Sequence, residues 1–184
     1  MKRFILLSCL IIGLSTELHA NSDSLIRQKN DVEFDYSSLE MKRLCLIDSI
    51  IEFASKHVGT PYKYAGCSPN GFDCSGFMNF VHAHYGIQLV RSSREIARYG
   101  DDIKFDDIEP GDLVFFKGRK TSTTTVGHVG LVVEKTATSF KMIHASVSNG
   151  VRYDDYTSAY YRTRFLFAKR LSYTPIESPV MDIE

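Results

Sequence analysis

The sequence predicts an α+β domain in which helices come first and an antiparallel sheet follows. Apolar residues recur at helical spacing over 44–58 and again over 74–85. After Gly100 the chain changes to short apolar runs separated by turns, and we expect strands over 113–116, 126–134, 139–146, 151–154 and 164–171. Helices that precede a series of strands favour an N-terminal helical layer packed on a central antiparallel sheet of about five strands.

Each predicted element has recognisable start and stop signals. The first helix ends at Gly59-Thr60-Pro61. The second begins at Asp73 and closes at Gly86, and a third, shorter helix is expected after Ser92-Ser93. A turn at Pro110-Gly111-Asp112 introduces the first of the strands.

The composition is that of one globular domain with short appendages. The chain has 184 residues, of which 43% are hydrophobic and 24% charged. The formal net charge at pH 7 is zero, and no long basic or acidic run is present. This balance argues against nucleic acid as a partner, because binding to a phosphate backbone depends on clustered Lys and Arg.

The N-terminus is predicted to direct export. Residues 1–20 combine a basic start with a short apolar run, and Ala20 is a suitable cleavage point for a secretory signal. The run is too short for a stable membrane span, and cleavage before Cys9 as a lipoprotein is the disfavoured alternative. We therefore expect a periplasmic, envelope-associated or secreted protein. The predicted divisions are a signal peptide over 1–20, a polar spacer over 21–40, the domain over 41–173 and a flexible tail over 174–184.

The cysteine count points to a free thiol. Cleavage after Ala20 leaves Cys45, Cys67 and Cys74, and an odd number in an exported protein implies a free thiol or an intermolecular bridge. Pairing of Cys45 with Cys67 would leave Cys74 alone, and the sequence leaves this open. The spacing from Cys67 to Cys74 fits no zinc template, so we expect neither a metal nor another cofactor.

Cys74 is the candidate nucleophile. Asp73 is suited to cap the second helix, so Cys74 falls at its first position, where the N–H groups favour a thiolate. The alternative is a small buried cysteine with no chemical role.

Two histidines are candidates for the accompanying base. The runs around His128 and His144 read as two strands joined by a polar turn. A hairpin centred on Thr136 would set these histidines directly opposite each other, with their β-carbons ~5 Å apart on one face of the sheet. One imidazole can then take the thiol proton while the second fixes its tautomer. A buried structural pair with satisfied hydrogen bonds is the alternative.

Six short motifs together resemble the NlpC-type cell-wall peptidase family, which are papain-like cysteine hydrolases acting on peptidoglycan peptides. The resemblance covers about residues 43–171. The motifs are Gly59-Thr60-Pro61-Tyr62, Gly71-Phe72-Asp73-Cys74-Ser75-Gly76-Phe77, Arg91-Ser92-Ser93, Pro110-Gly111-Asp112-Leu113-Val114, Gly127-His128-Val129-Gly130 and Ile143-His144-Ala145.

The resemblance implies a papain-like fold and a role for each of several residues. Cys74 would be the nucleophile, His128 the base and His144 the orienting residue. Tyr62 would lie beside the thiol and help to position the carbonyl or the oxyanion, with the backbone N–H of Cys74 as an oxyanion donor. It further implies contact with the stem peptide from Asp73 and from the Arg91-Ser92-Ser93 segment, although a plain helix cap is an equal reading of Asp73.

The chain departs from the family pattern near the site. Ala65-Gly66 stands where relatives often have two glycines, Val90 where they commonly have Pro, and Ile96 where they have Gln. The Thr121–Thr125 loop is longer than usual. Ala65-Gly66 would narrow the approach to the site, whereas the changes at Val90 and Ile96 and the longer loop concern substrate preference more than chemistry.

The resemblance, together with the candidate Cys-His arrangement, implies a cysteine endopeptidase that cuts peptidoglycan stem peptides through a thioester. Two bonds fit: the γ-D-glutamyl link to the diamino acid within a stem, and the diaminopimelate–D-alanine crosslink between stems. The alternatives are an amidase or acyltransferase with the same Cys-His chemistry, and a wall-binding module without activity.

Overall fold

The computed structural model describes residues 38–173. The chain divides into a unit over 1–42, of which residues 38–42 are described and helical, and a unit over 43–184 that carries the sheet. The predicted signal peptide, the spacer up to residue 37 and the tail over 174–184 lie outside the described residues.

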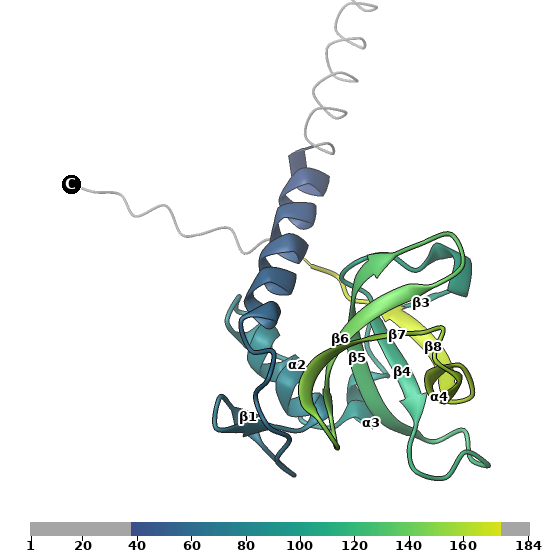
Figure 1. Cartoon of the computed structure of the whole chain (residues 1–184). Coiled ribbons are helices and arrows are strands. Elements are labelled where there is room, and N and C mark those ends of the chain that lie inside the picture. The colour runs from purple at the N-terminus through teal and green to yellow at the C-terminus, as the bar shows by residue number, and fades with distance from the viewer. Residues whose placement is uncertain (1–37, 174–184) are drawn as a thin grey trace, which may run out of the picture. The chain divides into compact units, whose positions relative to one another are not determined.

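A six-stranded antiparallel sheet forms the centre of the second unit (Figure 1). Its spatial order is β3-β8-β4-β5-β6-β7, so the hairpins β4–β5, β5–β6 and β6–β7 lie side by side and β8 returns to pair with β4. A separate two-stranded hairpin precedes it. The strands are β1 (Cys67–Ser68), β2 (Gly71–Phe72), β3 (Asp101–Ile103), β4 (Leu113–Lys117), β5 (Val126–Lys135), β6 (Phe140–Ser146), β7 (Gly150–Asp155) and β8 (Phe165–Arg170).

The helices come mostly before the sheet, as the sequence predicts. The first is described from residue 38 and ends at 55, and it is followed by α2 (Cys74–Ala83) and α3 (Ser93–Ile96). Two short elements lie between strands, the 3-10 helix η1 (Phe105–Asp107) and α4 (Ala159–Arg162). Helix α2 packs on β5 and β6, and α3 packs on β5.

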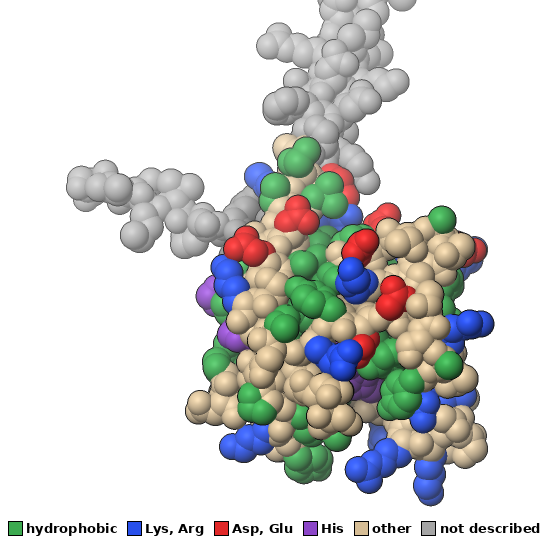
Figure 2. All heavy atoms as spheres, viewed as in Figure 1, with side chains coloured by type: hydrophobic (Ala, Val, Ile, Leu, Met, Phe, Trp, Pro, Cys, Tyr) green, Lys and Arg blue, Asp and Glu red, His purple; other side chains and the backbone are tan. Residues whose placement is uncertain are grey.

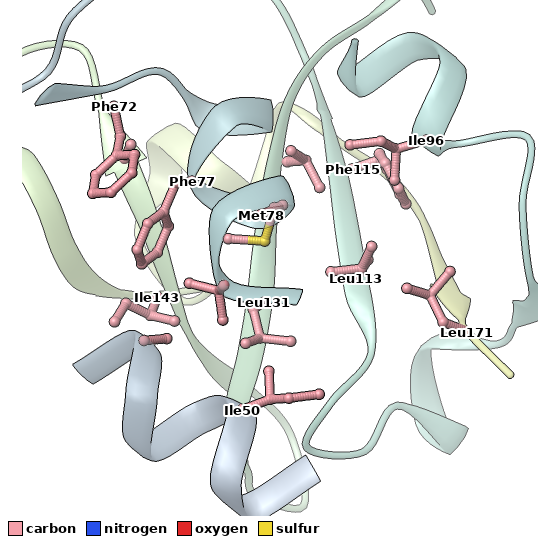
Figure 3. Packing of buried hydrophobic residues seen from close by; sticks show 14 of the residues in the cluster. Ile50, Phe72, Phe77, Met78, Ile96, Leu113, Phe115, Leu131, Ile143 and Leu171 are labelled. Atoms are coloured by element: carbon pink, nitrogen blue, oxygen red, sulfur yellow. The ribbon is translucent and has the colours of Figure 1, made fainter. Parts of the chain in front are cut away.

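One face of the sheet packs against the helices. Figure 3 shows Phe77 and Met78 of α2 directed towards the side of the sheet from which Leu131 and Ile143 project. Ile50 of the first helix closes the same cluster, and all five side chains are almost fully buried. Burial of such side chains contributes roughly 1.5–3 kcal/mol each, which fixes the start of α2 against β5 and β6.

The opposite face of the sheet carries a second, smaller core. Because side chains alternate along a strand, the residues next in sequence to those of the first core project to the other side. Val132 of β5 and Met142 of β6 pack there with Phe116, Phe140 and Tyr161. Both faces are therefore apolar over the middle of the sheet.

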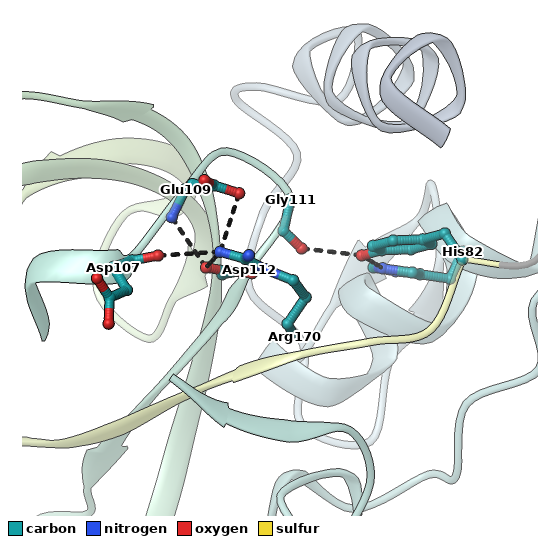
Figure 4. A network of polar contacts seen from close by, with 7 residues as sticks. His82, Asp107, Glu109, Gly111, Asp112 and Arg170 are labelled. Atoms are coloured by element: carbon teal, nitrogen blue, oxygen red, sulfur yellow. Dashed lines mark hydrogen bonds and ion pairs between the residues drawn. The ribbon is translucent and has the colours of Figure 1, made fainter. Parts of the chain in front are cut away.

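The Pro110-Gly111-Asp112 motif has a structural role (Figure 4). Asp112 is 1% exposed and accepts hydrogen bonds of 2.8 and 2.9 Å from the guanidinium of Arg170. Gly111 has φ +94°, and a Cβ there would meet Ile47 at 2.8 Å. The Tyr173 hydroxyl lies 2.9 Å from the Gly111 carbonyl and 3.2 Å from Nε2 of His82, so this network ties β8 and α2 to the β4 turn.

The predicted class is confirmed, with three differences in detail. The sixth strand, β3, was not expected, because three residues beginning with two aspartates carry no strand pattern. The β1–β2 hairpin and α4 were also missed, since both are too short to show a periodicity. The first helix ends at residue 55, three residues before the expected end.

The surface carries both signs of charge, and Figure 2 shows acidic and basic side chains on the same face. Among the described residues, no helix is both long and apolar enough to cross a membrane.

Candidate active site

Cys74 is the first residue of α2, and the preceding residue caps the helix as predicted. Asp73 has extended backbone angles (φ −92°, ψ 175°), and its Oδ1 accepts a 2.7 Å hydrogen bond from the Gly76 N–H. The Asp73 carbonyl accepts from the Phe77 N–H. The cap thereby uses two of the helix's first N–H groups and leaves those of Cys74 and Ser75 beside the sulfur.

Arg91 holds the cap in place from the loop before α3. Its two terminal nitrogens donate to the two oxygens of Asp73 at 2.9 and 2.7 Å, and they also reach the Ser75 hydroxyl and the Gly66 carbonyl. Burial acts to raise the pKa of Asp73, but the hydrogen bonds from Arg91 and Gly76 outweigh it, and the net pKa is lowered. Asp73 is therefore an ionised carboxylate whose oxygens already have protein partners.

The thiol of Cys74 lies against β5. The backbone N–H of Val129, the residue after His128, lies close to the sulfur, so the geometry joins the start of α2 to the histidine strand. Burial, followed by the neighbouring Asp73 carboxylate, raises the pKa of Cys74 above its ordinary value, against the smaller opposing effect of the N–H groups of Val129 and Ser75. The expectation of a thiolate favoured by the helix start alone is thus wrong. Desolvation of the charge dominates in the free protein.

The predicted hairpin register is also wrong, although the two histidines do meet. Leu131 pairs with Ile143, which sets Gly130 opposite His144. His128 therefore lies two residues along β5 from the position directly opposite His144. The cause is a four-residue turn over 136–139 and a bulge between Val132 and Glu134. A shift of two residues keeps a side chain on its face, whereas a shift of one would have separated the rings.

The imidazoles lie in direct contact. Nε2 of His128 lies 2.9 Å from Nδ1 of His144, and the ring planes stand nearly perpendicular at a centroid distance of 4.8 Å. His144 is 1% exposed and His128 is half-buried.

Two further residues complete this hydrogen-bonded chain, and the sequence reasoning missed both. Oδ2 of Asp154 lies 2.9 Å from Nε2 of His144, and the Tyr161 hydroxyl donates to the same Oδ2 at 2.8 Å. Arg152 pairs with His144 across β6 and β7, so Asp154, two residues further on, projects from the same face. The predicted strand over 151–154 contains Asp154, but the sequence pattern does not fix the register of this strand against β6.

The partners assign the tautomers along the chain. A carboxylate only accepts, so His144 donates through Nε2–H to Asp154, and in the neutral ring its Nδ1 is then an acceptor. His128 must then donate through Nε2–H to His144. Its Nδ1 remains unprotonated, so His128 is an available base with a fixed basic nitrogen.

The same surroundings set the charges. Burial, and then the neighbouring His144, lower the pKa of His128 to about 3, so its ring is neutral near pH 7. Burial acts to raise the pKa of Asp154, but hydrogen bonds from His144 and Tyr161 outweigh it and lower the net pKa. Burial also raises the pKa of Tyr161, which keeps its hydroxyl protonated and donating. At rest, Cys74 is therefore a neutral thiol, His128 a neutral imidazole and Asp154 a carboxylate.

Tyr62 belongs to the Cys74 side of the site. Its backbone bridges to Phe72, two residues before Cys74. Burial raises its pKa, and the neighbouring Cys74 and Asp73 act in the same direction. Tyr62 is therefore a protonated O–H donor in the surroundings of the thiol.

The remaining predicted residues lie in other contacts. Ser92 is the backbone N-cap of α3 without a side-chain cap bond, and Ser93 is that helix's first residue.

Cys45 and Cys67 are exposed free thiols, so the pairing left open by the sequence is absent. Within residues 38–173 no three His, Cys, Asp or Glu side chains are grouped to hold a metal. Thr121–Thr125 is an exposed loop between β4 and β5.

This arrangement supplies a nucleophile, a base with a fixed tautomer and N–H donors for a developing negative charge. It fits acyl transfer from an amide or ester through a covalent thioester.

Comparisons with known proteins match the chain to one family model and to relatives named as endopeptidases or peptidoglycan hydrolases. The model of the NlpC/P60 family matches residues 59–170. A curated relative, "Probable endopeptidase NlpC" of Escherichia coli strain K12, is 39% identical over 114 residues, covering 61% of this chain and 70% of the relative. An NlpC/P60 family protein of Bacillus cereus ATCC 10987 superposes with a TM-score of 0.61 at 29% identity, over 67% of this chain. This chain spans only 39% of that longer protein. The NlpC/p60 domain of the peptidoglycan hydrolase SagA superposes with a TM-score of 0.57 at 25% identity, over 68% of this chain and 98% of the domain.

Proposed function

The chain belongs to the NlpC/P60 family, a family of endopeptidases and peptidoglycan hydrolases, and from this premise we propose that it is a cysteine endopeptidase cutting stem peptides of peptidoglycan. The observation that carries the proposal is the hydrogen-bonded chain from His128 through His144 to Asp154, on the strand that the Cys74 sulfur touches. This chain leaves His128 one basic nitrogen, and a thiol needs such a base because its own pKa is raised.

In the acylation step, Sγ of Cys74 attacks the carbonyl carbon of the scissile amide. The thiol proton passes to Nδ1 of His128, so the thiolate forms as the S–C bond forms. The carbonyl electron pair moves to the oxygen, which the N–H of Cys74 and the Tyr62 hydroxyl stabilise. One such donor is often worth about 3 kcal/mol.

The collapse of this intermediate breaks the C–N bond. His128 returns its proton to the departing nitrogen, which leaves as an amine, and the acyl group remains on Cys74 as a thioester. Asp154 stabilises the positive charge that His128 carries between these events, through His144.

Water completes the cycle. His128 takes a proton from the water molecule as its oxygen attacks the thioester carbonyl. The C–S bond then breaks, the acid product leaves, and the sulfur recovers its proton from His128.

Both candidate bonds place a diamino acid on the amine side. In the γ-D-glutamyl link the leaving amine is that of the diamino acid, and in the crosslink it is an amine of diaminopimelate. We propose that the substrate is one of these two, and that the protein is exported to reach it, in line with the predicted signal over 1–20.

The test is a digestion of purified muropeptides under reducing conditions, with the fragments weighed by mass spectrometry. Wild type should produce fragments cut between two amino acids, and Cys74→Ala should produce none. Unchanged cleavage by Cys74→Ala would refute the proposal. A freed lactyl carboxylate or a transferred acyl group would instead identify an amidase or acyltransferase. Binding of muropeptides without turnover would identify a wall-binding module.

A further inference from the structure

A pocket of about 310 Å³ opens beside the catalytic histidines, on the face of the sheet opposite α2. We call it the β6–β7 pocket. His128, His144, Asp154 and Tyr161 form its inner wall. The turn between β6 and β7 and its surroundings supply the rest, namely Ser146, Val147, Ser148, Asn149, Arg152 and Tyr160.

The position of this pocket relates it to one half of the substrate. Cys74 does not line it, and Asp73 and Arg91 lie on the Cys74 side of the site. In the proposed mechanism the departing amine takes its proton from His128. The amine-side residue must therefore pass the ring of His128, and the pocket begins at that ring.

Arg152 supplies the positive charge in the pocket, and its partner Asp154 carries the matching negative charge. Both oxygens of Asp154 are engaged, Oδ1 by Arg152 at 2.9 Å and Oδ2 by His144 and Tyr161. A guanidinium has five N–H donors. Two nitrogens of Arg152 donate to described residues. Nη2 donates to Asp154, and Nε donates to the Tyr153 carbonyl at 3.4 Å. The Arg152 side chain is 42% exposed, so its remaining donors are accessible to a ligand.

A second arginine adds positive charge at the outer wall. The guanidinium carbon of Arg164 lies 3.8 Å from the ring centroid of Tyr160, and its Nη1 donates to the Tyr160 carbonyl. This contact fixes Tyr160 as a wall of the pocket. The hydroxyls and amide of the β6–β7 turn are neutral, so Asp154 is the one carboxylate among the described residues that line the pocket.

We propose that the β6–β7 pocket binds the free carboxylate of the amine-side diamino acid, with Arg152 as its principal ligand. The inference rests on the proposed function for the identity of the substrate. A guanidinium fork matches a carboxylate geometrically, and a pocket of this size holds one amino-acid side group. Arg152 would thereby select substrates whose leaving residue carries a negative charge.

Binding tests the pocket independently of turnover. Meso-diaminopimelic acid and its diamide are titrated into the Cys74→Ala protein and followed by NMR. The acid should shift the amides of the β6–β7 turn and bind at least tenfold more tightly than the diamide. Arg152→Ala in the same background should abolish the difference, Arg152→Lys should retain part of it, and Arg162→Ala should leave it unchanged. Arg162 is exposed on α4 and does not line the pocket.

Kinetics tests the role in catalysis. Two stem peptides are compared whose amine-side residue ends in a carboxylate or in a carboxamide. Arg152→Ala should lower kcat/KM about 10- to 100-fold more for the carboxylate peptide than for the carboxamide peptide. Retained cleavage of the carboxamide peptide shows that the variant is folded, and the difference between the two peptides isolates the contact with the carboxylate.

The two proposals fail in different ways. If wild type cleaves both peptides equally and Arg152→Ala changes neither, the pocket assignment is wrong while the endopeptidase stands. If wild type cleaves no stem peptide but the Cys74→Ala protein binds the diamino acid through Arg152, the pocket stands and the endopeptidase is wrong. Absence of Arg152-dependent binding overturns the pocket assignment whatever the turnover.

Discussion

Replacement of Asp154 should slow the chemistry without preventing substrate binding. The carboxylate accepts from His144 at 2.9 Å and reaches the base only through that ring. Its negative charge stabilises the imidazolium that forms on His128 during the reaction. A charge-assisted hydrogen bond of this kind is worth about 1.5–3 kcal/mol, which corresponds to about a 10- to 150-fold loss of kcat. Asp154→Ala should approach the larger figure and Asp154→Asn the smaller, since an amide oxygen still accepts from His144.

The pH profile separates this role from a structural one. The Asp154 charge raises the pKa of His128 against the stronger lowering by burial. Its removal lowers that pKa further, so the acid limb of kcat should move to lower pH while KM for the carboxamide peptide stays constant. Asp102→Asn is the control, because that carboxylate is 83% exposed and pairs with Lys169 at the other end of the sheet.

The assay is the release of amine from a stem peptide between pH 2 and 9, with melting curves at each pH to show that the variants are folded. A kcat within twofold of wild type in Asp154→Ala, with an unmoved acid limb, would refute the reasoning. Asp154 would then be an ordinary surface carboxylate beside the histidines.

Three other changes test the fold. The buried His82 has a pKa lowered to about 4 in the folded protein, whereas in the unfolded chain this ring binds a proton below about pH 6.5. The free energy of unfolding should therefore fall by about 3 kcal/mol from pH 6.5 to 4. Denaturant titrations should show a shallower pH slope for His82→Gln, and an equal slope would contradict the assignment. Ala65 has φ +58°, so Ala65→Gly should raise the unfolding free energy by about 0.5–1 kcal/mol in urea titrations, and a loss of stability would count against strain there. Arg170→Ala leaves the Asp112 charge buried without its partner and should lower the free energy of unfolding by about 3 kcal/mol in the same titrations. A decrease below about 1 kcal/mol would show that other groups stabilise Asp112.

Local patterns were enough to predict most of the fold. Periodicity located α2 and five of the six strands of the large sheet, because each has at least five residues with an apolar pattern. The cap at Asp73 followed from its residue type alone. The strand β3 escaped because its place depends on pairing with β8, which lies more than sixty residues away.

The candidate site was less accessible to such patterns. The prediction that His128 and His144 share one face of the sheet is correct although the predicted register is wrong. The register differs by an even number of residues, and such a shift keeps each side chain on its face. Asp154 and Tyr161 join the site through β7 and α4, whose positions depend on tertiary packing. The direction of the Cys74 pKa likewise depends on burial against β5, which helix position alone does not reveal.

The most direct test of covalent catalysis by Cys74 is the intact mass of the protein, quenched in acid within milliseconds of mixing with a stem peptide. Wild type should gain the mass of the acyl fragment, located on Cys74 by peptide mapping and removed by hydroxylamine. Cys74→Ala should gain nothing and should not cleave the peptide. A cleaving wild type with no adduct, together with undiminished cleavage by Cys74→Ala, would contradict the account.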